Sequence, residues 1–339
     1  MRSIRFHQHG PPDVLRYEDA PDPPPAPGRA IVRVRATALN HLDLWQRRGI
    51  ERVQIPLPHI SGSDVAGEVV DAGGGGVAAG TRVMLHPGLG CGTCQACAEG
   101  RDNLCRTYDV LGLMSDGGYA ELVSVPAENL MPIPSGIPFV EAAAFPLTFL
   151  TAWHMLVTLA RVRAAEVVLV LAGGSGVGQA AIQVARLHGA RVFATSGAAK
   201  MARTAELGAE QVFDHDADDF GRQARALTGG RGVDVVVEHV GEATWDRSVR
   251  SLANGGRLVT CGATTGHRAS LDLRHLFARQ LSLLGSYMGA RQELVDAAAH
   301  YFAGRLRPVV DSVLPLREAA AAHRRLEARE QFGKIVLEV

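Results

Sequence analysis

The sequence lacks a surplus of charge of either sign, because its 339 residues hold 35 Lys plus Arg against 35 Asp plus Glu. Proteins that bind nucleic acid usually carry a basic surplus, so we expect no nucleic-acid partner. Long apolar runs are also absent, since the run VVLVLAG at residues 167–173 is far shorter than a membrane span. The first residues, MRSIRFHQHGPPDV, show no apolar segment of a secretory signal. We therefore expect a cytoplasmic protein without membrane attachment.

Cysteines are few, and four of the five lie within residues 91–105, spaced C-x2-C-x2-C-x7-C. In a reducing compartment this spacing predicts a zinc site rather than disulfides. Four thiolates fill a tetrahedral zinc completely, so the ion would hold a lobe (about residues 88–106) and perform no chemistry. Its predicted ligands are Cys91, Cys94, Cys97 and Cys105. The fifth cysteine, Cys261, is expected to be a small buried hydrophobe.

The pattern of the chain changes near its middle. Up to about residue 130, short β-type runs alternate with turn residues, which predicts a barrel-like β domain. From about residue 140, apolar strands alternate with helical segments, which predicts a parallel sheet covered on both faces. The length suits two domains.

A glycine-rich loop, LAGGSGVG, links the first parallel strand to its helix. Such a loop lets the backbone approach a pyrophosphate at the positive end of the helix. Compared with G-x-G-x-x-G, the middle glycine is replaced by Ser175. The predicted dinucleotide-binding residues here are Gly173, Gly174, Ser175, Gly176, Val177 and Gly178.

The end of the second parallel strand bears on the choice of cofactor. A site for NAD expects an Asp or Glu there, which would bind the ribose 2′-hydroxyl. The sequence offers Ser196, followed by Lys200 and Arg203, and no acid. A hydroxyl and two cations suit a 2′-phosphate, so we predict NADPH over NADH. The alternative is that the two cations are ordinary solvated helix residues.

Together with the cysteine lobe and the glycine loop, the segments ALNHLDLWQRRG, GGYAE and AAAFPLTFLTAW resemble the medium-chain dehydrogenase/reductase superfamily over essentially the full length. Within it, the chain is similar to zinc-binding alcohol dehydrogenases and quinone oxidoreductases. The resemblance implies an α/β protein with two domains. A GroES-like β-barrel catalytic domain would comprise residues 1–130 and 291–339, and a Rossmann doubly wound domain residues 131–290.

The resemblance also implies what the catalytic centre lacks. Alcohol dehydrogenases of this superfamily bind a second, catalytic zinc through three ligands. The corresponding positions here hold Asn40, Ser63 and Leu147, and Leu42 replaces the hydroxyl of the proton relay. We therefore expect no catalytic zinc. An unusual metal site made by His41, His59, Ser63 and Asp64 is the alternative.

Zinc-free members of the superfamily reduce activated C=C bonds of quinones or α,β-unsaturated carbonyls. By resemblance, the amide N–H of Asn40 would bind the substrate carbonyl and stabilise the developing enolate. Asp43 would assist there or only brace its loop. Ser63 and Thr151 complete the predicted catalytic residues. The resemblance also assigns Gly262, Ala263 and Lys334 to the cofactor.

Three functions remain open from the sequence. The first is an NADPH-dependent reductase of activated alkenes or quinones, acting on a small-molecule substrate. The second is an alcohol or carbonyl dehydrogenase with an unusual or absent catalytic metal. The third is a cofactor-binding partner protein with little catalysis of its own.

The segment QLSLLGSYMGA contains no charged residue and predicts a strand near residues 281–289. By resemblance this strand lies at the edge of the sheet and pairs with its twin in a second copy. An uncovered apolar edge is a liability, so we expect a homodimer, or a tetramer built from two dimers.

Overall fold

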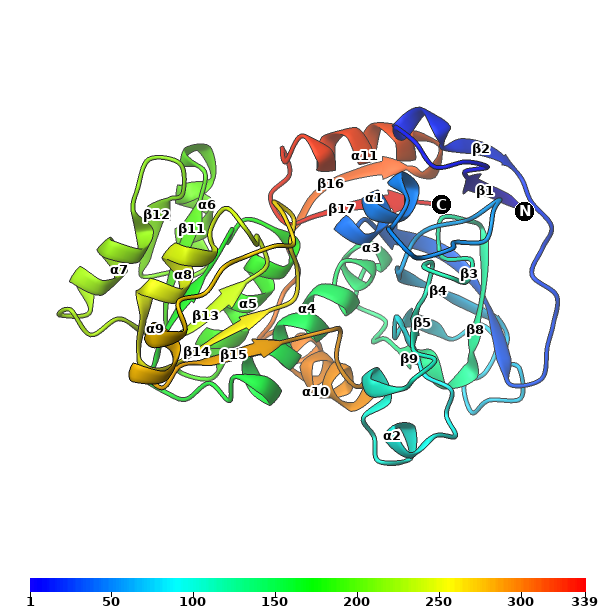
Figure 1. Ribbon diagram of the computed structural model, residues 1–339. Helices are drawn as coiled ribbons and strands as arrows, with labels where there is room; N and C mark the ends of the chain where they lie inside the picture. Colours follow the sequence, from blue (N-terminus) through cyan, green and yellow to red (C-terminus); the bar gives the residue numbers. More distant parts are fainter. The chain divides into compact units, whose positions relative to one another are not determined.

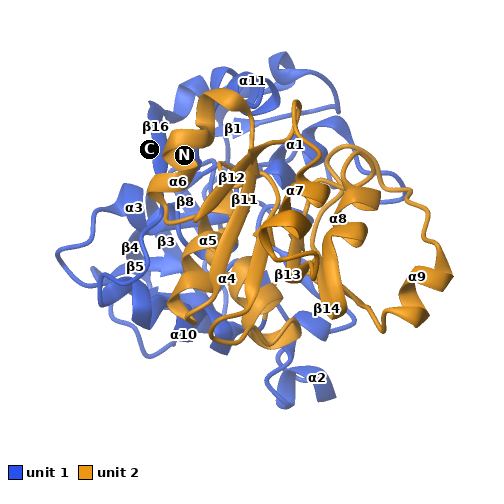
Figure 2. Cartoon of the chain, turned by 90° about the vertical axis from the view of Figure 1, so that its left-hand side faces the viewer, with its two compact units in different colours: residues 1–147, 290–339 blue, residues 148–289 orange.

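Two structural units make up the chain, and the computed structural model describes all of it, residues 1–339. Unit 1 consists of Met1–Leu147 and Ala290–Val339, and unit 2 of Thr148–Gly289 (Figure 2). The first boundary thus lies further along the chain than the predicted one at residue 130. The reason is that β9 (Leu130–Pro132) pairs with β5 (Arg82–Leu85), and α3 (Phe139–Ala143) packs against β3 (Arg29–Ala38) and β4 (Asp64–Asp71).

Unit 1 is built on a seven-stranded sheet with the order β16-β17-β3-β4-β5-β9, in which β8 also pairs with β3. Its remaining strands and helices are β1 (Arg2–Arg5), β2 (Arg16–Asp19), α1 (His41–Arg48), β6 (Gly88–Leu89), α2 (Gln95–Ala98), β7 (Asp109–Val110), β8 (Leu122–Pro126), α10 (Arg291–Phe302), β16 (Val310–Pro315), α11 (Ala319–Glu327) and β17 (Lys334–Glu338) (Figure 1).

The C-terminal residues complete this sheet rather than that of unit 2. Strand β17 runs antiparallel to β3, with Val336 opposite Ala38, and β3 pairs on its other side with β4. One core cluster is formed by side chains of β3, β4 and β5, among others, and includes Val32, Val65 and Val83. A second joins α1, α11 and β17 and includes Leu44, Leu326 and Ile335.

Unit 2 contains a six-stranded parallel sheet with the order β12-β11-β10-β13-β14-β15. Its elements after α4 (Pro146–Trp153), which crosses the unit boundary, are β10 (Val167–Val170), α5 (Gly176–Leu187), β11 (Arg191–Ser196), α6 (Met201–Glu206), β12 (Gln211–Asp214), α7 (Phe220–Leu227), β13 (Val233–Glu238), α8 (Trp245–Ser251), β14 (Leu252–Thr260), α9 (Leu273–Ala278) and β15 (Ser282–Gly285).

This strand order, counted from β10, is that of the doubly wound dinucleotide-binding fold, so the predicted fold class is confirmed. All four residues of β10 are fully buried, as expected for a central parallel strand. The predicted edge strand is found as β15 at the end of the sheet, but it is shorter than expected because the chain leaves the sheet at Gly285. None of the helices combines the length and hydrophobicity needed to cross a membrane.

Candidate active site

Three neighbouring strands of unit 1 bring together two predicted site residues, Asn40 and Lys334, and Asp64, which belonged only to the alternative metal site. Asn40 follows the end of β3 as the N-cap of α1, and Asp64 begins β4, where it lies opposite Ala38 of β3. Lys334 begins β17, the strand on the other side of β3. Residues far apart in sequence therefore meet at one end of the sheet.

The side chains of Asn40, Asp64 and Lys334, here called the ammonium cluster, form a closed ring of hydrogen bonds. The Lys334 Nζ donates to Asn40 Oδ1 at 2.6 Å and to Asp64 Oδ2 at 2.8 Å. The Asn40 Nδ2 donates to the same Asp64 Oδ2 at 2.9 Å, and the other carboxylate oxygen accepts the backbone N–H of Leu147 at 2.8 Å. Lys334 is 2% exposed, Asp64 0% and Asn40 7%. A buried ion pair of this kind needs such additional bonds to offset its desolvation.

Asp43 and Ser63 lie in the same region of unit 1. Asp43 Oδ2 accepts the backbone N–H of Asn40 at 2.7 Å and the hydroxyl of Tyr119 at 3.1 Å, which fits the bracing role considered for it. Burial raises the pKa of Asp43 to about 6. Ser63 is fully buried, and its Oγ makes no hydrogen bond.

The ammonium cluster and its surroundings do not form a metal site. The four cysteines are the only group of three or more His, Cys, Asp or Glu side chains whose ligand atoms gather closely. His59 Nε2 is bound to the carbonyl of Gly112 at 2.8 Å, and the Asp64 carboxylate is bound to Lys334. The alternative metal site at His41, His59, Ser63 and Asp64 is therefore not preassembled.

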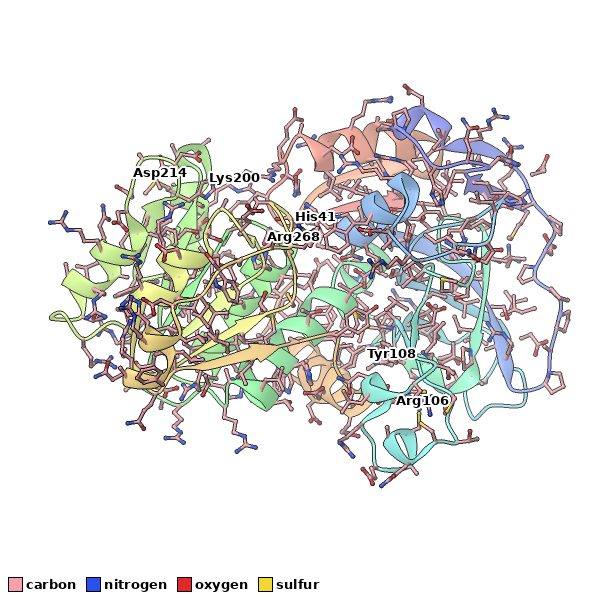
Figure 3. The ribbon with its side chains drawn as sticks, in the orientation of Figure 1. His41, Arg106, Tyr108, Lys200, Asp214 and Arg268 are labelled. Atoms are coloured by element: carbon pink, nitrogen blue, oxygen red, sulfur yellow. The ribbon has the colours of Figure 1, made fainter.

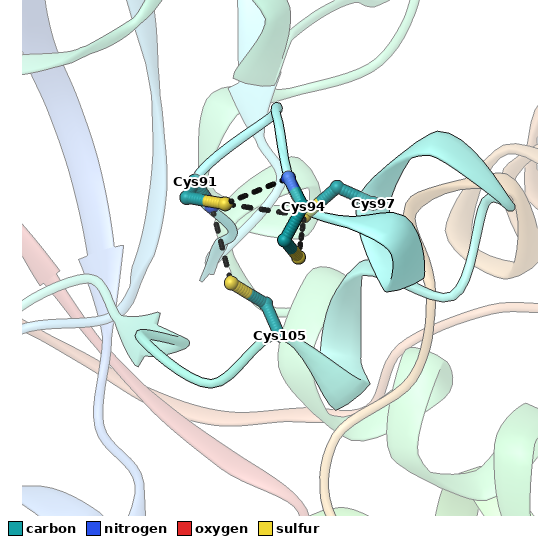
Figure 4. A group of neighbouring side chains, drawn as sticks. All are labelled: Cys91, Cys94, Cys97 and Cys105. Atoms are coloured by element: carbon teal, nitrogen blue, oxygen red, sulfur yellow. Dashed lines mark hydrogen bonds between the residues drawn. The ribbon is translucent and has the colours of Figure 1, made fainter.

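The cysteine lobe brings its four Sγ atoms within 4.8 Å of one another (Figure 4). The Sγ–Sγ distances are 3.6 Å for Cys94 and Cys97 and 3.9 Å for Cys91 and Cys97. A tetrahedral zinc with Zn–S bonds of about 2.3 Å would place its sulfur ligands about 3.8 Å apart. The backbone N–H groups of Cys94 and Cys91 point at Cys91 Sγ and Cys105 Sγ, as expected for thiolates. The cluster thus fits a zinc ion with no open position.

In unit 2 the glycine loop has the geometry of a dinucleotide site. Ser175 is the N-cap of α5, and its Oγ accepts the backbone N–H of Gly178 at 2.9 Å. A Cβ on Gly178 would lie 2.2 Å from the carbonyl oxygen of Ala172, so only glycine allows this close approach of helix and strand. The serine in place of the middle glycine is therefore a helix cap, which leaves the motif intact.

The ends of β11 and β12 surround the position where a ribose 2′-substituent is expected. Ser196 ends β11, and its partner in the register is Asp214, the last residue of β12. His215 donates its backbone N–H to the Ser196 carbonyl. Its ring would lie 3.8 Å from a Cβ placed on Gly197. Figure 3 shows Lys200 and Asp214 at the same edge of this unit. Sequence reasoning missed Asp214 and His215, because only the pairing of β12 with β11 brings them beside Ser196.

The ends of β13 and β14 hold the other predicted cofactor residues. Gly262 follows β14, and a Cβ there would lie 3.1 Å from the carbonyl oxygen of His239. The ring of His239, a residue that sequence reasoning missed, bonds the Leu171 carbonyl at 2.8 Å and lies 3.5 Å from Ser175 Oγ. Thr151 lies on α4 and is 5% exposed.

Known proteins share these features across the whole chain. Residues 26–135 match the alcohol dehydrogenase GroES-like domain, and residues 176–303 match the zinc-binding dehydrogenase family. A solved structure of an NAD-dependent alcohol dehydrogenase is 46% identical with a TM-score of 0.96, and 100% of both chains is covered. A quinone oxidoreductase of Pseudomonas aeruginosa is 32% identical over 99% of both chains. The chain belongs to the medium-chain dehydrogenase/reductase superfamily.

Another relative from this superfamily is an acryloyl-coenzyme A reductase of Metallosphaera sedula, 29% identical over 98% of both chains. Membership makes the chain an oxidoreductase that uses a nicotinamide cofactor, as the sequence predicted. The family and the cysteine cluster together indicate a structural zinc. The catalytic roles assigned to single residues stay predictions. Lys334 was predicted to contact the cofactor. In the structure its ammonium is hydrogen-bonded to Asn40 and Asp64 within unit 1.

Proposed function

We propose that this enzyme reduces an activated C=C bond, in a quinone or an α,β-unsaturated carbonyl compound, with NADPH and without a catalytic metal. The observation that carries the proposal is the ammonium cluster. By the family resemblance, the positions that bind zinc in alcohol dehydrogenases correspond to Asn40, Ser63 and Leu147 here. The neighbouring Asp64 carboxylate is paired with Lys334. The cation that balances this carboxylate thus belongs to the chain itself, and the carboxylate is not left to bind a metal ion.

Conjugate reduction suits such a site because it needs no Lewis acid. NADPH would supply a hydride with its electron pair to the β-carbon, while the C=C electrons move to the carbonyl oxygen and water protonates the resulting enolate. The charge on oxygen is spread over the enolate, so a neutral amide donor such as Asn40 suffices. Asp43 holds the loop that carries Asn40 through the backbone N–H.

The preference for NADPH rests on the end of β11. Ser196, Lys200 and Arg203 offer a hydroxyl and two cations to a 2′-phosphate, and the ring of His215 lies beside Gly197. Asp214 argues in the other direction, since it lies opposite Ser196 and would repel a phosphate. A second acid, Asp216, lies 3.6 Å from His215 Nε2. We favour NADPH because no acid ends β11 itself and two cations follow it.

An alcohol or carbonyl dehydrogenase activity is the second candidate. The observation in its favour is the 46% identity to the NAD-dependent alcohol dehydrogenase structure, which exceeds that to the quinone oxidoreductase. Overall identity reports the fold more than the chemistry, which depends on a few residues of the site.

A homodimer through β15 is part of the proposal. The strand lies at the edge of the six-stranded sheet and pairs only with β14. Its outer edge is therefore available for pairing with a second copy. Leu273 and Phe277 on the adjoining helix α9 are 65% and 70% exposed. We expect light scattering to give twice the chain mass. Phe277→Asp would lower this mass, whereas a wild-type monomer at every concentration would contradict the dimer.

A substrate panel tests the reaction. Purified enzyme is incubated with NADPH, or with NADH in parallel, and a quinone, an enone, an enoyl thioester or a simple aldehyde, while the absorbance of the reduced cofactor is followed. We expect oxidation of NADPH with at least one conjugated substrate and none with the aldehyde, before and after treatment with a chelator. Activity confined to alcohols and aldehydes, and restored by added zinc, would support the second candidate instead.

A further inference from the structure

We infer that Lys334 is a positioning residue for the proposed reduction: its ammonium fixes the Asn40 amide in the orientation that offers an N–H to the substrate oxygen. The inference rests on the proposed function, and it gives Lys334 a different role from the cofactor contact that family resemblance implies. The side chain would act through Asn40 and would not touch the cofactor.

The first argument is the direction of the hydrogen bonds. An ammonium can only donate and a carboxylate can only accept, so Lys334 and Asp64 together allow one orientation of the amide between them. Oδ1 must face Nζ, at 2.6 Å, and Nδ2 must face the Asp64 carboxylate, at 2.9 Å. In a flipped amide, Nδ2 would face the Lys334 ammonium, where both groups are donors. Oδ1 would then face the Asp64 carboxylate, where both groups are acceptors.

The second argument is the state of the remaining amide hydrogen. Nδ2 carries two hydrogens, and the one that does not face Asp64 has only the Ala38 carbonyl as a partner, at a long 3.4 Å. This N–H is the donor that a substrate oxygen would take. Donation from Nζ to Oδ1 also polarises the amide and strengthens its N–H groups as donors.

The third argument is the choice of lysine. The chain has 35 basic Lys plus Arg residues, and its sequence contains lysine only at positions 200 and 334. Arginine presents a planar fork suited to two parallel bonds, whereas an ammonium is a compact charge with three donors. Two of these donors bind Asn40 and Asp64, while the Lys334 side chain itself is only 2% exposed.

Steady-state kinetics with a conjugated substrate tests the inference. The variant Lys334→Met leaves the Asp64 charge buried without its partner, so the double variant Lys334→Met/Asp64→Asn is measured beside it to keep the fold. We expect the double variant to lose about a hundredfold in kcat, as for the loss of an oriented donor. The dissociation constant of NADPH, measured by fluorescence, should stay within about twofold of the wild-type value. Lys334→Arg should recover part of the rate.

Lysine-selective NMR gives a readout that is independent of turnover. In Lys200→Arg protein, Lys334 is the single lysine, so one side-chain signal reports on it. Asn40→Ala in this background should shift that signal, whereas Asn129→Ala, a buried asparagine bound to His86 and Gly88, should not. A Lys334 signal whose chemical shift is unchanged in Asn40→Ala would overturn the proposed contact.

The outcomes separate the two proposals. If the wild-type enzyme reduces no conjugated substrate, the proposed function fails whatever the variants do. If it reduces such a substrate and the double variant keeps full kcat, only the role of Lys334 fails. A large rise in the NADPH dissociation constant of Lys334→Met at unchanged kcat would also overturn it and return Lys334 to the cofactor.

Discussion

The cysteine lobe and the ammonium cluster both contain negatively charged side chains, but they differ in where the balancing cation comes from. The lobe gathers four thiol side chains, of which Cys91 is exposed, and its cation must come from solution. The ammonium cluster carries its own cation on β17, covalently attached and 2% exposed. We therefore expect the lobe to need zinc for its folding, whereas the ammonium cluster is complete once the chain has folded.

Removing a zinc ligand should have the largest effect. We expect Cys97→Ala to reduce the zinc content from one ion per chain to near zero and to lower the free energy of unfolding by several kcal/mol, because zinc binding is coupled to folding. Elemental analysis and thermal denaturation measure both. Cys261→Ala, at a cysteine outside the cluster, is the matched control and should retain the zinc. Two tightly held zinc ions in the wild type would contradict the absence of a catalytic metal.

Breaking the ion pair of the ammonium cluster should come next. Asp64→Ala leaves the Lys334 charge buried without a partner and should cost about 3–5 kcal/mol of unfolding free energy. The double variant Asp64→Leu/Lys334→Met removes both charges and should be nearly as stable as the wild type. Denaturant titration compares the two. An equal loss of stability in both would show that packing, not charge pairing, dominates at this position.

Asp43 allows a test of pH dependence beside the same cluster. Its pKa is about 6 in the folded protein against about 4 in an unfolded chain, so the folded state binds more protons between these values. This group's contribution to stability therefore falls as pH rises from 4 to 6. Relative to the wild type, Asp43→Asn should gain on the order of 2–3 kcal/mol between pH 4 and pH 7. Parallel denaturation curves for the two proteins across this range would argue against the raised pKa.

The smallest effect concerns the other lysine, which lies near the surface of unit 2. Lys200→Ala should weaken NADPH binding about tenfold, or about 1.4 kcal/mol, and NADH binding much less, because only NADPH carries the 2′-phosphate. Fluorescence titration with each cofactor measures this. Arg222→Ala on α7 serves as a control for the loss of an exposed cation. Equal weakening of both cofactors would make Lys200 an ordinary surface charge.

Much of the fold could be predicted because it is encoded in local patterns. Apolar strands such as β10 alternate with helices in the sequence, and the strand order of unit 2 follows the expected doubly wound arrangement. The boundary of unit 1 at Leu147 differs from the expected one near residue 130, since the place of β9 depends on its pairing with β5. Asp214 was missed for a similar reason, because only the register of β11 and β12 sets it opposite Ser196.

By itself, the sequence determined the zinc lobe and the glycine loop, because their residues are close neighbours along the chain and their spacing alone sets the geometry. Only the tertiary structure decided the surroundings of Asn40. Lys334 lies 294 positions further along the chain and reaches Asn40 because β17 and β4 pair with the two sides of β3. A shift of one residue in either register would turn these side chains to the opposite face. No local pattern predicts the register of strands so far apart in the chain, because it is set by how their apolar faces pack in the folded sheet.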